Sequence, residues 1–120
     1  MKKSVLIIIS FVLTIITLVI LYYDQPSKNE ICIDAFIKAG QVEYKGLVDK
    51  KYIDINHAIP IFIVKDKNNI SLKVSNYRDI SGLFDYIEVG DSIIKEGDSY
   101  EIIVIRNNFE KKFTLDYGCN

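Results

Sequence analysis

His57 is the only histidine in the chain, and it lies three residues after Asp54. A carboxylate at this spacing can orient an imidazole for proton transfer or join it in binding a metal. With Asp91 as a further carboxylate, the three side chains are the candidates for a small hydrolase or a metal-dependent site. A single histidine with no cysteine nearby is a poor set of zinc ligands, however. The pattern therefore favours a histidine that hydrogen-bonds the backbone of a loop.

A second candidate for chemistry is the segment Gly90-Asp91-Ser92-Ile93. It resembles the nucleophile block of the GDSL hydrolases, in which the serine attacks an ester. That family also needs a downstream Asp-x-x-His, and no histidine follows Ser92. We expect instead that Gly90 and Asp91 form a turn, in which the carboxylate of Asp91 caps backbone N–H groups. We predict no catalytic residue in this segment.

Acidic residues gather between positions 79 and 91, namely Asp79, Asp85, Glu88 and Asp91. Carboxylate oxygens are ligands for calcium, but the spacing here differs from that of a calcium-binding loop. Arg78 also adjoins the group. We therefore expect a solvated acidic face and predict no bound metal and no cofactor.

Tyrosine is abundant, with eight residues in 120. Aromatic rings on one face can stack against bases or sugars. In strands that alternate, most tyrosines are expected to be half-buried sheet residues. The ones that we single out as possible ligand contacts, together with Asp54 and His57, are Tyr44, Tyr52, Tyr77 and Tyr86. If two or more shared an exposed face, a site for an oligosaccharide or a lipid head group would be favoured.

The distribution of charge divides the chain into two parts. Residues 5–23 carry no charge, and all 16 acidic residues lie at or after Asp24. The remaining residues, 24–120, suffice for one small domain, which excludes a kinase, a dinucleotide-binding fold or an α/β hydrolase. This part has a formal charge of −3 and no run of basic residues. That charge argues against nucleic acid as a partner.

Residues 5–23 are predicted to form a transmembrane helix. Nineteen helical residues span about 28 Å, close to the hydrocarbon core of a bilayer. The alternative is a cleaved signal peptide, whose apolar region is shorter and ends in a small-x-small site. Residues 21–24 offer no such site. Lys2 and Lys3 place residues 1–4 in the cytoplasm by the positive-inside rule, and residues 24–30 would be a linker to an exported domain of residues 31–120.

The exported domain shows mainly strand patterns. Residues 31–39 favour a short helix, with Gly40 as a left-handed stop, although a strand is also compatible there. Six strands are expected after it, at residues 42–48, 59–64, 70–74, 86–95, 100–106 and 112–117. Gly46 indicates a bulge or a bend. Residues 96–99 and the pair Asn107-Asn108 are expected to be hairpin turns, because they tolerate positive φ.

These elements predict a mainly β fold. A small antiparallel sheet must cover its edges and one face, and curling into a barrel does both. We expect an OB-like or SH3-like antiparallel barrel of about six strands, with one short helix. A half-open sandwich of five or six strands is the alternative.

The chain has two cysteines, Cys32 and Cys119, near the two limits of the predicted domain. Cysteine pairs are commonly bridged in the oxidising compartment that an exported domain meets. We predict a disulfide that closes a loop of about 88 residues. Two unrelated buried thiols are the alternative.

Residues 44–119 carry a wider resemblance. Their segments are similar to those of small, uncharacterised single-pass or exported bacterial proteins of the Bacteroidetes type. The matching segments are residues 44–48, the pair Asn56-His57, residues 84–95 and residues 115–119. The resemblance implies membrane topology and no activity. Taken together, the sequence predicts a non-catalytic, membrane-tethered binding module of the bacterial cell envelope, with a membrane and an envelope protein or component as partners.

Overall fold

A computed structural model describes residues 1–119 of the chain. The contacts within the chain divide it into two compact units, Met1–Ile31 and Cys32–Asn120. Each unit is described by itself below.

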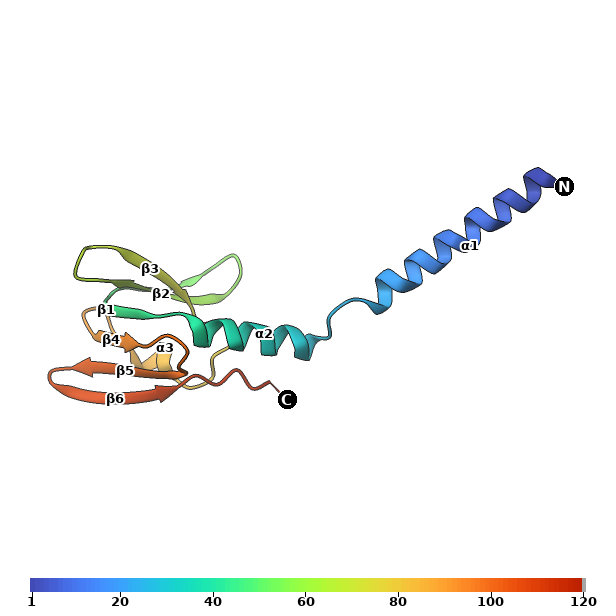
Figure 1. Ribbon diagram of the computed structural model, residues 1–120. Helices are drawn as coiled ribbons and strands as arrows, with labels where there is room; N and C mark the ends of the chain where they lie inside the picture. Colours follow the sequence, from blue (N-terminus) through green and yellow to red (C-terminus); the bar gives the residue numbers. More distant parts are fainter. Residues whose placement is uncertain (120) are drawn as a thin grey trace. The chain divides into compact units, whose positions relative to one another are not determined.

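The first unit is dominated by α1, Lys2–Tyr23, the helix at the blue end of the chain in Figure 1. It is long and apolar enough to cross a membrane, and a signal sequence near the N-terminus would meet the same criteria. The hydroxyls of Thr14 and Thr17 each donate to the carbonyl four residues earlier, at 2.9 Å. These bonds satisfy the two hydroxyls within the helix itself.

A second helix, α2, spans Lys28–Gln41. Ser27 and Glu30 form a capping box at its start: the Ser27 hydroxyl accepts from the Glu30 N–H at 3.1 Å, and Glu30 Oε2 accepts from the Ser27 N–H at 2.7 Å. The helix therefore begins inside the expected linker of residues 24–30. It also continues past Ala39, and Gly40 is helical rather than left-handed.

Six strands form one antiparallel sheet (Figure 1). They are β1 Tyr44–Asp54, β2 Ile59–Lys65, β3 Ser71–Ser75, β4 Ser92–Lys95, β5 Glu101–Arg106 and β6 Phe109–Thr114. Their order in the sheet is β3-β2-β1-β4-β5-β6. The mainly β, six-stranded prediction is confirmed at this level.

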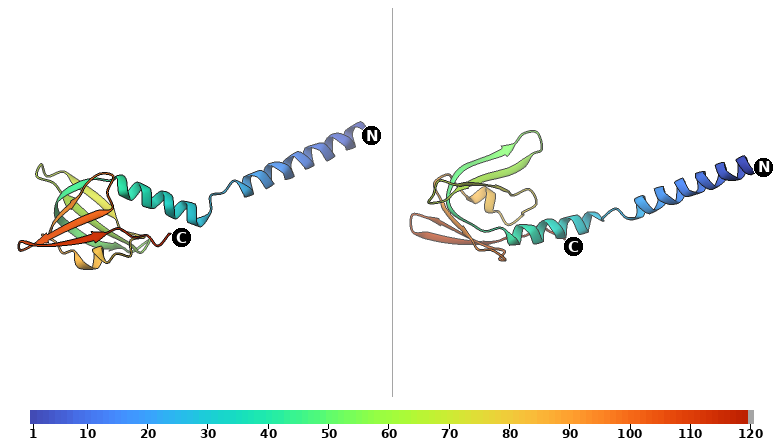
Figure 2. Two further views of the ribbon diagram at one scale, coloured as in Figure 1. Left: turned by 60° about the horizontal axis from the view of Figure 1, so that its bottom comes forward. Right: turned by 45° about the horizontal axis from the view of Figure 1, so that its top comes forward.

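The long strand β1 changes its partner part-way along. Its residues 44–47 pair with β4, and its residues 47–54 pair with β2. The exchange bends the sheet, with the β2–β3 and β5–β6 hairpins at its two edges (Figure 2). Gly46 lies at this exchange, where an added Cβ would collide with the backbone of Lys65. The glycine at this position thus has a steric reason, and the register shift of the β1–β2 ladder lies further along, between Val48 and Lys50.

The sheet is open, which corrects the expectation of a closed barrel. In residues 1–119, no ladder joins the edge strands β3 and β6. The segment after β3 instead reaches the segment after β6 through single bonds. The Ile80 N–H donates to the Asp116 carbonyl at 2.8 Å, and the Asp116 N–H donates to the Asp79 carboxylate at 3.0 Å. These bonds hold the two segments together without strand pairing.

The strand expected at residues 86–95 is only partly correct. Its first residue ends a short helix, α3 Leu83–Tyr86, and β4 takes only the last four residues. Leu83 and Ile87 are fully buried at a helical spacing of four, and Gly82 precedes them with a left-handed φ of 87°. Burial of these two side chains in the core, with Phe62 and Ile93, outweighs the strand pattern.

Candidate functional site

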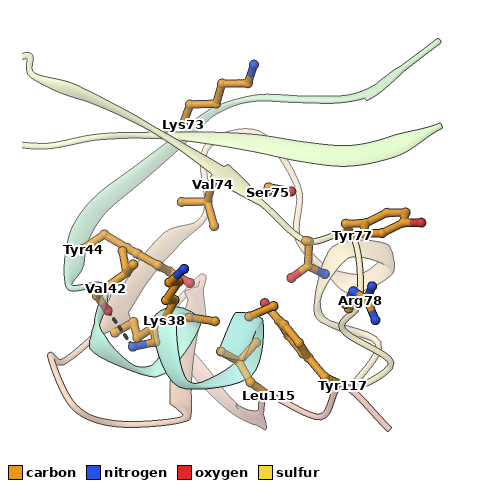
Figure 3. Close-up of a pocket in the computed structure, with 14 residues that line it drawn as sticks. Lys38, Val42, Tyr44, Lys73, Val74, Ser75, Tyr77, Arg78, Leu115 and Tyr117 are labelled. Atoms are coloured by element: carbon orange, nitrogen blue, oxygen red, sulfur yellow. Dashed lines mark hydrogen bonds between the residues drawn. The ribbon is translucent and has the colours of Figure 1, made fainter. Parts of the chain in front are cut away.

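A cleft of about 360 Å³ lies on the open side of the sheet, among α2, β3 and the segment after β6 (Figure 3). Its apolar surface comes from small and branched side chains, so it is suited to an aliphatic group. The apolar residues are Ala35, Ala39, Val42, Val74 and Leu115. Figure 3 shows Val74 pointing from β3 toward α2, and Lys73 pointing away from the helix.

Packing of α2 against the sheet forms one wall of this cleft. Phe36 stacks on Tyr100 with ring centroids 4.1 Å apart, and it contacts Tyr117 edge to face. A Cβ on Gly40 would lie 2.6 Å from the Tyr100 ring. Gly40 is therefore required for the close approach of the helix rather than for its ending. The disulfide between Cys32 and Cys119 holds the same helix against the C-terminal segment.

Lys95 is buried beneath the cleft, where its ammonium caps the carboxyl end of α2. It donates to the carbonyls of Gly40 at 2.7 Å, Val42 at 2.6 Å and Glu96 at 3.1 Å. The side chain is 1% exposed. Burial lowers the pKa of Lys95, whereas the carboxylates of Asp98 and Glu43 act to raise it. All three donors of the ammonium are satisfied, so its role is structural.

The charged residues that line the cleft are all basic, although the Asp79 carboxylate lies near its tyrosines. Its lining residues include Lys38, Lys73, Lys95 and Arg78, and none of the 14 is acidic. Lys38 bonds Asp34 on the exposed face of α2, at 2.8 Å. Because Lys73 points away from α2 and three carbonyls hold the Lys95 ammonium, Lys38 and Arg78 are the basic residues left to favour an anionic group in the cleft.

Two tyrosines of the cleft are neutral at physiological pH. Burial, followed by the nearby Asp79 carboxylate, raises the pKa of Tyr44 and of Tyr117 above the ordinary value. A neutral phenol can donate a hydrogen bond to an anion. Tyr44 is nearly buried at the start of β1, and Tyr117 is half-buried after β6.

Asp79 holds the rim of this region in place. Its carboxylate accepts from the Asn76 amide at 3.2 Å, the Ser81 hydroxyl at 2.6 Å and the backbone N–H of Asp116 at 3.0 Å. Asn76 is itself buried and lines the cleft. The carboxylate that the sequence placed in an acidic cluster thus fixes two loops.

The four tyrosines singled out in the sequence divide between different places. Tyr44 and Tyr77 line the cleft, and Tyr77 is 59% exposed at its edge. Tyr52 lies on the half of β1 that pairs with β2, and it is 40% exposed. Tyr86 ends α3, where Arg106 and Lys111 lie over its ring at 4.8 and 4.3 Å. Sequence reasoning missed Tyr117, although it lies two residues before Cys119.

Asp54 and His57 are brought together in the turn between β1 and β2. Their side chains are 3.2 Å apart, and the Asp54 carboxylate also accepts from the Asn56 N–H at 3.0 Å. The bond from His57, followed by that from Asn56, lowers the pKa of Asp54. The imidazole is mostly exposed. The pair therefore lies on an open turn rather than in a cleft.

Asp91 does not join that pair. Ser92 pairs with Leu47, seven residues before Asp54 along β1, and seven extended residues span about 23 Å. Asp91 instead accepts two bonds from Arg106, at 2.8 and 2.7 Å, and one from the Glu88 N–H at 2.8 Å. The turn and the cap predicted for Gly90-Asp91 are thereby confirmed. These hydrogen bonds from Arg106 are the main reason that the pKa of Asp91 is lowered.

A second cleft, of about 810 Å³, follows the exchange of partners in β1. Gly46, Leu47, Val89 and Ser92 are among its lining residues. Asp49 and Lys65 form an ion pair across it at 3.7 Å, so its charge is partly balanced. No histidine is among its lining residues, so Ser92 has no imidazole beside it to act as a general base. This cleft therefore indicates the chemistry of a ligand less clearly than the first cleft does.

No arrangement for a metal ion is found in the part of the chain that the structure describes. Within residues 1–119, no three His, Cys, Asp or Glu side chains come close enough to share an ion. No protein-family model, curated protein or solved structure matches the chain.

Proposed function

We propose that this chain is a membrane-tethered binding module of the cell envelope, which acts outside the cytoplasm and without catalysis. The helix α1 would be the uncleaved anchor, with Lys2 and Lys3 on the cytoplasmic side. The disulfide supports an oxidising compartment for the domain. The partner would be a protein or another component of the envelope.

The cleft beside α2 and β3 is the binding site in this proposal. Its apolar floor and its basic, acid-free lining carry the proposal, because together they suit a ligand with an aliphatic group and a negative charge. Tyr44 and Tyr117 would donate hydrogen bonds to the same charge. A ligand in this cleft would lie at the side where the sheet stays open and where the expected OB-like or SH3-like barrel would close.

The alternative, a hydrolase or metal-dependent site at Asp54, His57 and Asp91, has less support. Asp54 and His57 lie on an open turn, and Asp91 is engaged by Arg106 near the other end of β1. A catalytic pair needs hydrogen-bond contact in a site that a substrate can enter.

Binding of a simple anionic probe to the full chain in zwitterionic micelles tests the proposal. We expect N-acetyl-leucine to shift the methyl NMR signals of Val74 and Leu115, and neutral N-acetyl-leucinamide to bind several-fold more weakly. Arg78→Glu should weaken the binding of N-acetyl-leucine. Lys50→Glu, at an exposed position of β1 outside the cleft lining, is the matched control. Equal binding of both probes, or of neither, would contradict an anion-selective cleft.

A further inference from the structure

The cleft is lined on one side by β3, the edge strand of the sheet, and the outer edge of this strand has unpaired backbone groups. On its inner side, β3 pairs with β2 from Ser71↔Lys65 to Ser75↔Ile61. Flanking bonds fix which residues face β2: the Asn76 N–H donates to the Pro60 carbonyl at 2.9 Å, and the Asp66 N–H donates to the Ile70 carbonyl at 3.0 Å. Even-numbered residues therefore face β2 with their N–H and C=O groups.

It follows that the odd-numbered residues of β3 face outward. Within residues 1–119, the N–H and C=O groups of Ser71, Lys73 and Ser75 have no backbone partner. Such a row of alternating donors and acceptors is a template for another strand. The residues that follow β3 leave the sheet toward Asp116, so β6 does not cover this edge.

The side chains of β3 divide between two faces. Val74 lies opposite the buried Phe62, packs against the core and lines the cleft, whereas Lys73 points away from α2 (Figure 3). Residues directly opposite each other in paired strands share a face. A guest residue opposite Val74 would therefore enter the cleft, and its two neighbours would lie on the face of Lys73.

The basic residues at this edge limit which segment can pair with β3. Lys73 stands in the middle of the edge, on the face opposite the cleft, and the cleft itself has basic but no acidic lining residues. A second copy of this chain pairing through β3 would bring two copies of Lys73 close together, which is unfavourable for like charges. Acidic residues beside Lys73 would be favourable.

We propose that the occupant is an extended peptide segment of a partner protein that adds to β3 as a seventh strand. Its apolar side chain enters the cleft beside Val74, and acidic residues on either side of that side chain lie near Lys73. This inference rests on the proposed function, because it names the ligand of the same cleft. It adds that backbone pairing supplies affinity and that the cleft and Lys73 supply specificity.

A capped peptide, Thr-Val-Glu-Leu-Glu-Val-Thr, is the probe, measured against the full chain in zwitterionic micelles. We expect it to bind at least about tenfold more tightly than N-acetyl-leucine, because several backbone bonds are added. Hydrogen exchange should slow at the amides of Ser71, Lys73 and Ser75. Two N-methylated forms provide the internal control, one methylated at both glutamates and one at the leucine and both valines.

Only one of the two methylated peptides should lose binding, because alternate amides of a strand face opposite edges. In an antiparallel complex the N–H groups of the glutamates face β3, so methylation at the glutamates should abolish binding. In a parallel complex the N–H groups of the leucine and valines face β3, so methylation at these residues should abolish binding. On the protein side, Ser75→Pro removes an outward N–H without touching the β2 ladder, and edge positions tolerate proline. It should weaken the peptide about tenfold and N-acetyl-leucine, which makes no strand pairing, by much less, whereas Ser75→Ala should bind both with nearly the affinity of wild type.

The outcomes separate this inference from the proposed function. Equal loss with both methylated peptides, or unchanged exchange at the three outward amides, would overturn strand addition. The binding of N-acetyl-leucine would then still support the anionic cleft. If N-acetyl-leucine and the peptide both fail to bind to a chain that unfolds cooperatively, both proposals are overturned.

Discussion

The ammonium of Lys95 donates a 2.7 Å hydrogen bond to the carbonyl oxygen of Gly40. The bond joins the end of β4 to the last turn of α2, 55 residues apart in the sequence. Carbonyls at the end of a helix have no partner within the helix and attract a positive charge. Lys95 thus fixes the helix that forms one wall of the cleft.

Replacing Lys95 by methionine should destabilise the domain by about 2–4 kcal/mol. The substitution keeps the length of the side chain but leaves buried carbonyls without their charged donor. The measurement is denaturant unfolding of the full chain in a mild detergent. Lys67→Met, at an exposed turn position, is the control and should change the free energy of unfolding by less than about 0.5 kcal/mol.

The Asp91–Arg106 pair predicts how stability depends on acid. The folded-state pKa of Asp91 is lowered, so its contribution is present above the unfolded value of about 3.9. It is lost as the pH falls through the folded value. Thermal unfolding should therefore show a steep loss of stability below about pH 4.

Asp91→Asn should lower the melting temperature at pH 7 and flatten this dependence below pH 4. Asp54→Asn is the matched control, because the pKa of Asp54 is also lowered but its partner His57 is exposed. Its effect should be smaller. Identical pH profiles for wild type and Asp91→Asn would contradict the role given to this carboxylate.

Features encoded in adjacent residues could be predicted from the sequence. The turn at Asn107-Asn108 follows from the two side chains that best tolerate positive φ, and both residues adopt it. The apolar run before Asp24 forms the long helix. The capping box at Ser27 and Glu30 also follows from a spacing of three in the sequence, within the residues expected to be a polar linker.

Features that depend on distant contacts could not be predicted in this way. The sequence pattern indicates a helix stop at Gly40, whereas the structure explains this glycine by the close approach of Tyr100, a residue distant in the sequence. The open edge depends on where residues 76–82 leave the sheet, and the cleft depends on α2 packing there. Strand patterns alone do not encode either, since they specify faces and not closure.

The hairpin between β5 and β6 should be sensitive to its two turn residues. Asn107 and Asn108 have φ values of 50° and 63°, in a two-residue turn between Arg106 and Phe109. Changing both asparagines to valine should cost about 1–3 kcal/mol, from strain at positive φ. Changing both to glycine should cost much less. Thermal unfolding of the three chains distinguishes these results, and equal stability of the valine variant would contradict the turn.

Ala58 offers a stabilising substitution. It adopts a φ of 52° at the end of the turn that holds Asp54 and His57. A left-handed conformation costs an alanine about 1–2 kcal/mol, and glycine avoids most of that cost while losing some chain entropy. Ala58→Gly should therefore stabilise the domain by about 0.5–1 kcal/mol in denaturant unfolding. A loss of stability would show that the turn does not need this conformation.

The disulfide predicted from the two cysteines is present, with the Cα atoms of Cys32 and Cys119 5.9 Å apart. It ties α2 to the segment that carries Leu115 and Tyr117, both of which line the cleft. Replacing both cysteines by serine should cost about 2–5 kcal/mol. Below the melting temperature of that variant, it should also bind N-acetyl-leucine more weakly, because the C-terminal segment is no longer held against α2.

Two measurements check this prediction. Alkylation of the wild-type chain, isolated from membranes without reductant, should label no thiol until reductant is added. The single variants Cys32→Ser and Cys119→Ser should each expose one reactive thiol and lose as much stability as the double variant, since each breaks the same bond. Labelling of two thiols in the untreated wild type would contradict both the bridge and the oxidising compartment. A double variant as stable as wild type would show that the helix is held by Phe36, Tyr100 and Lys95 alone.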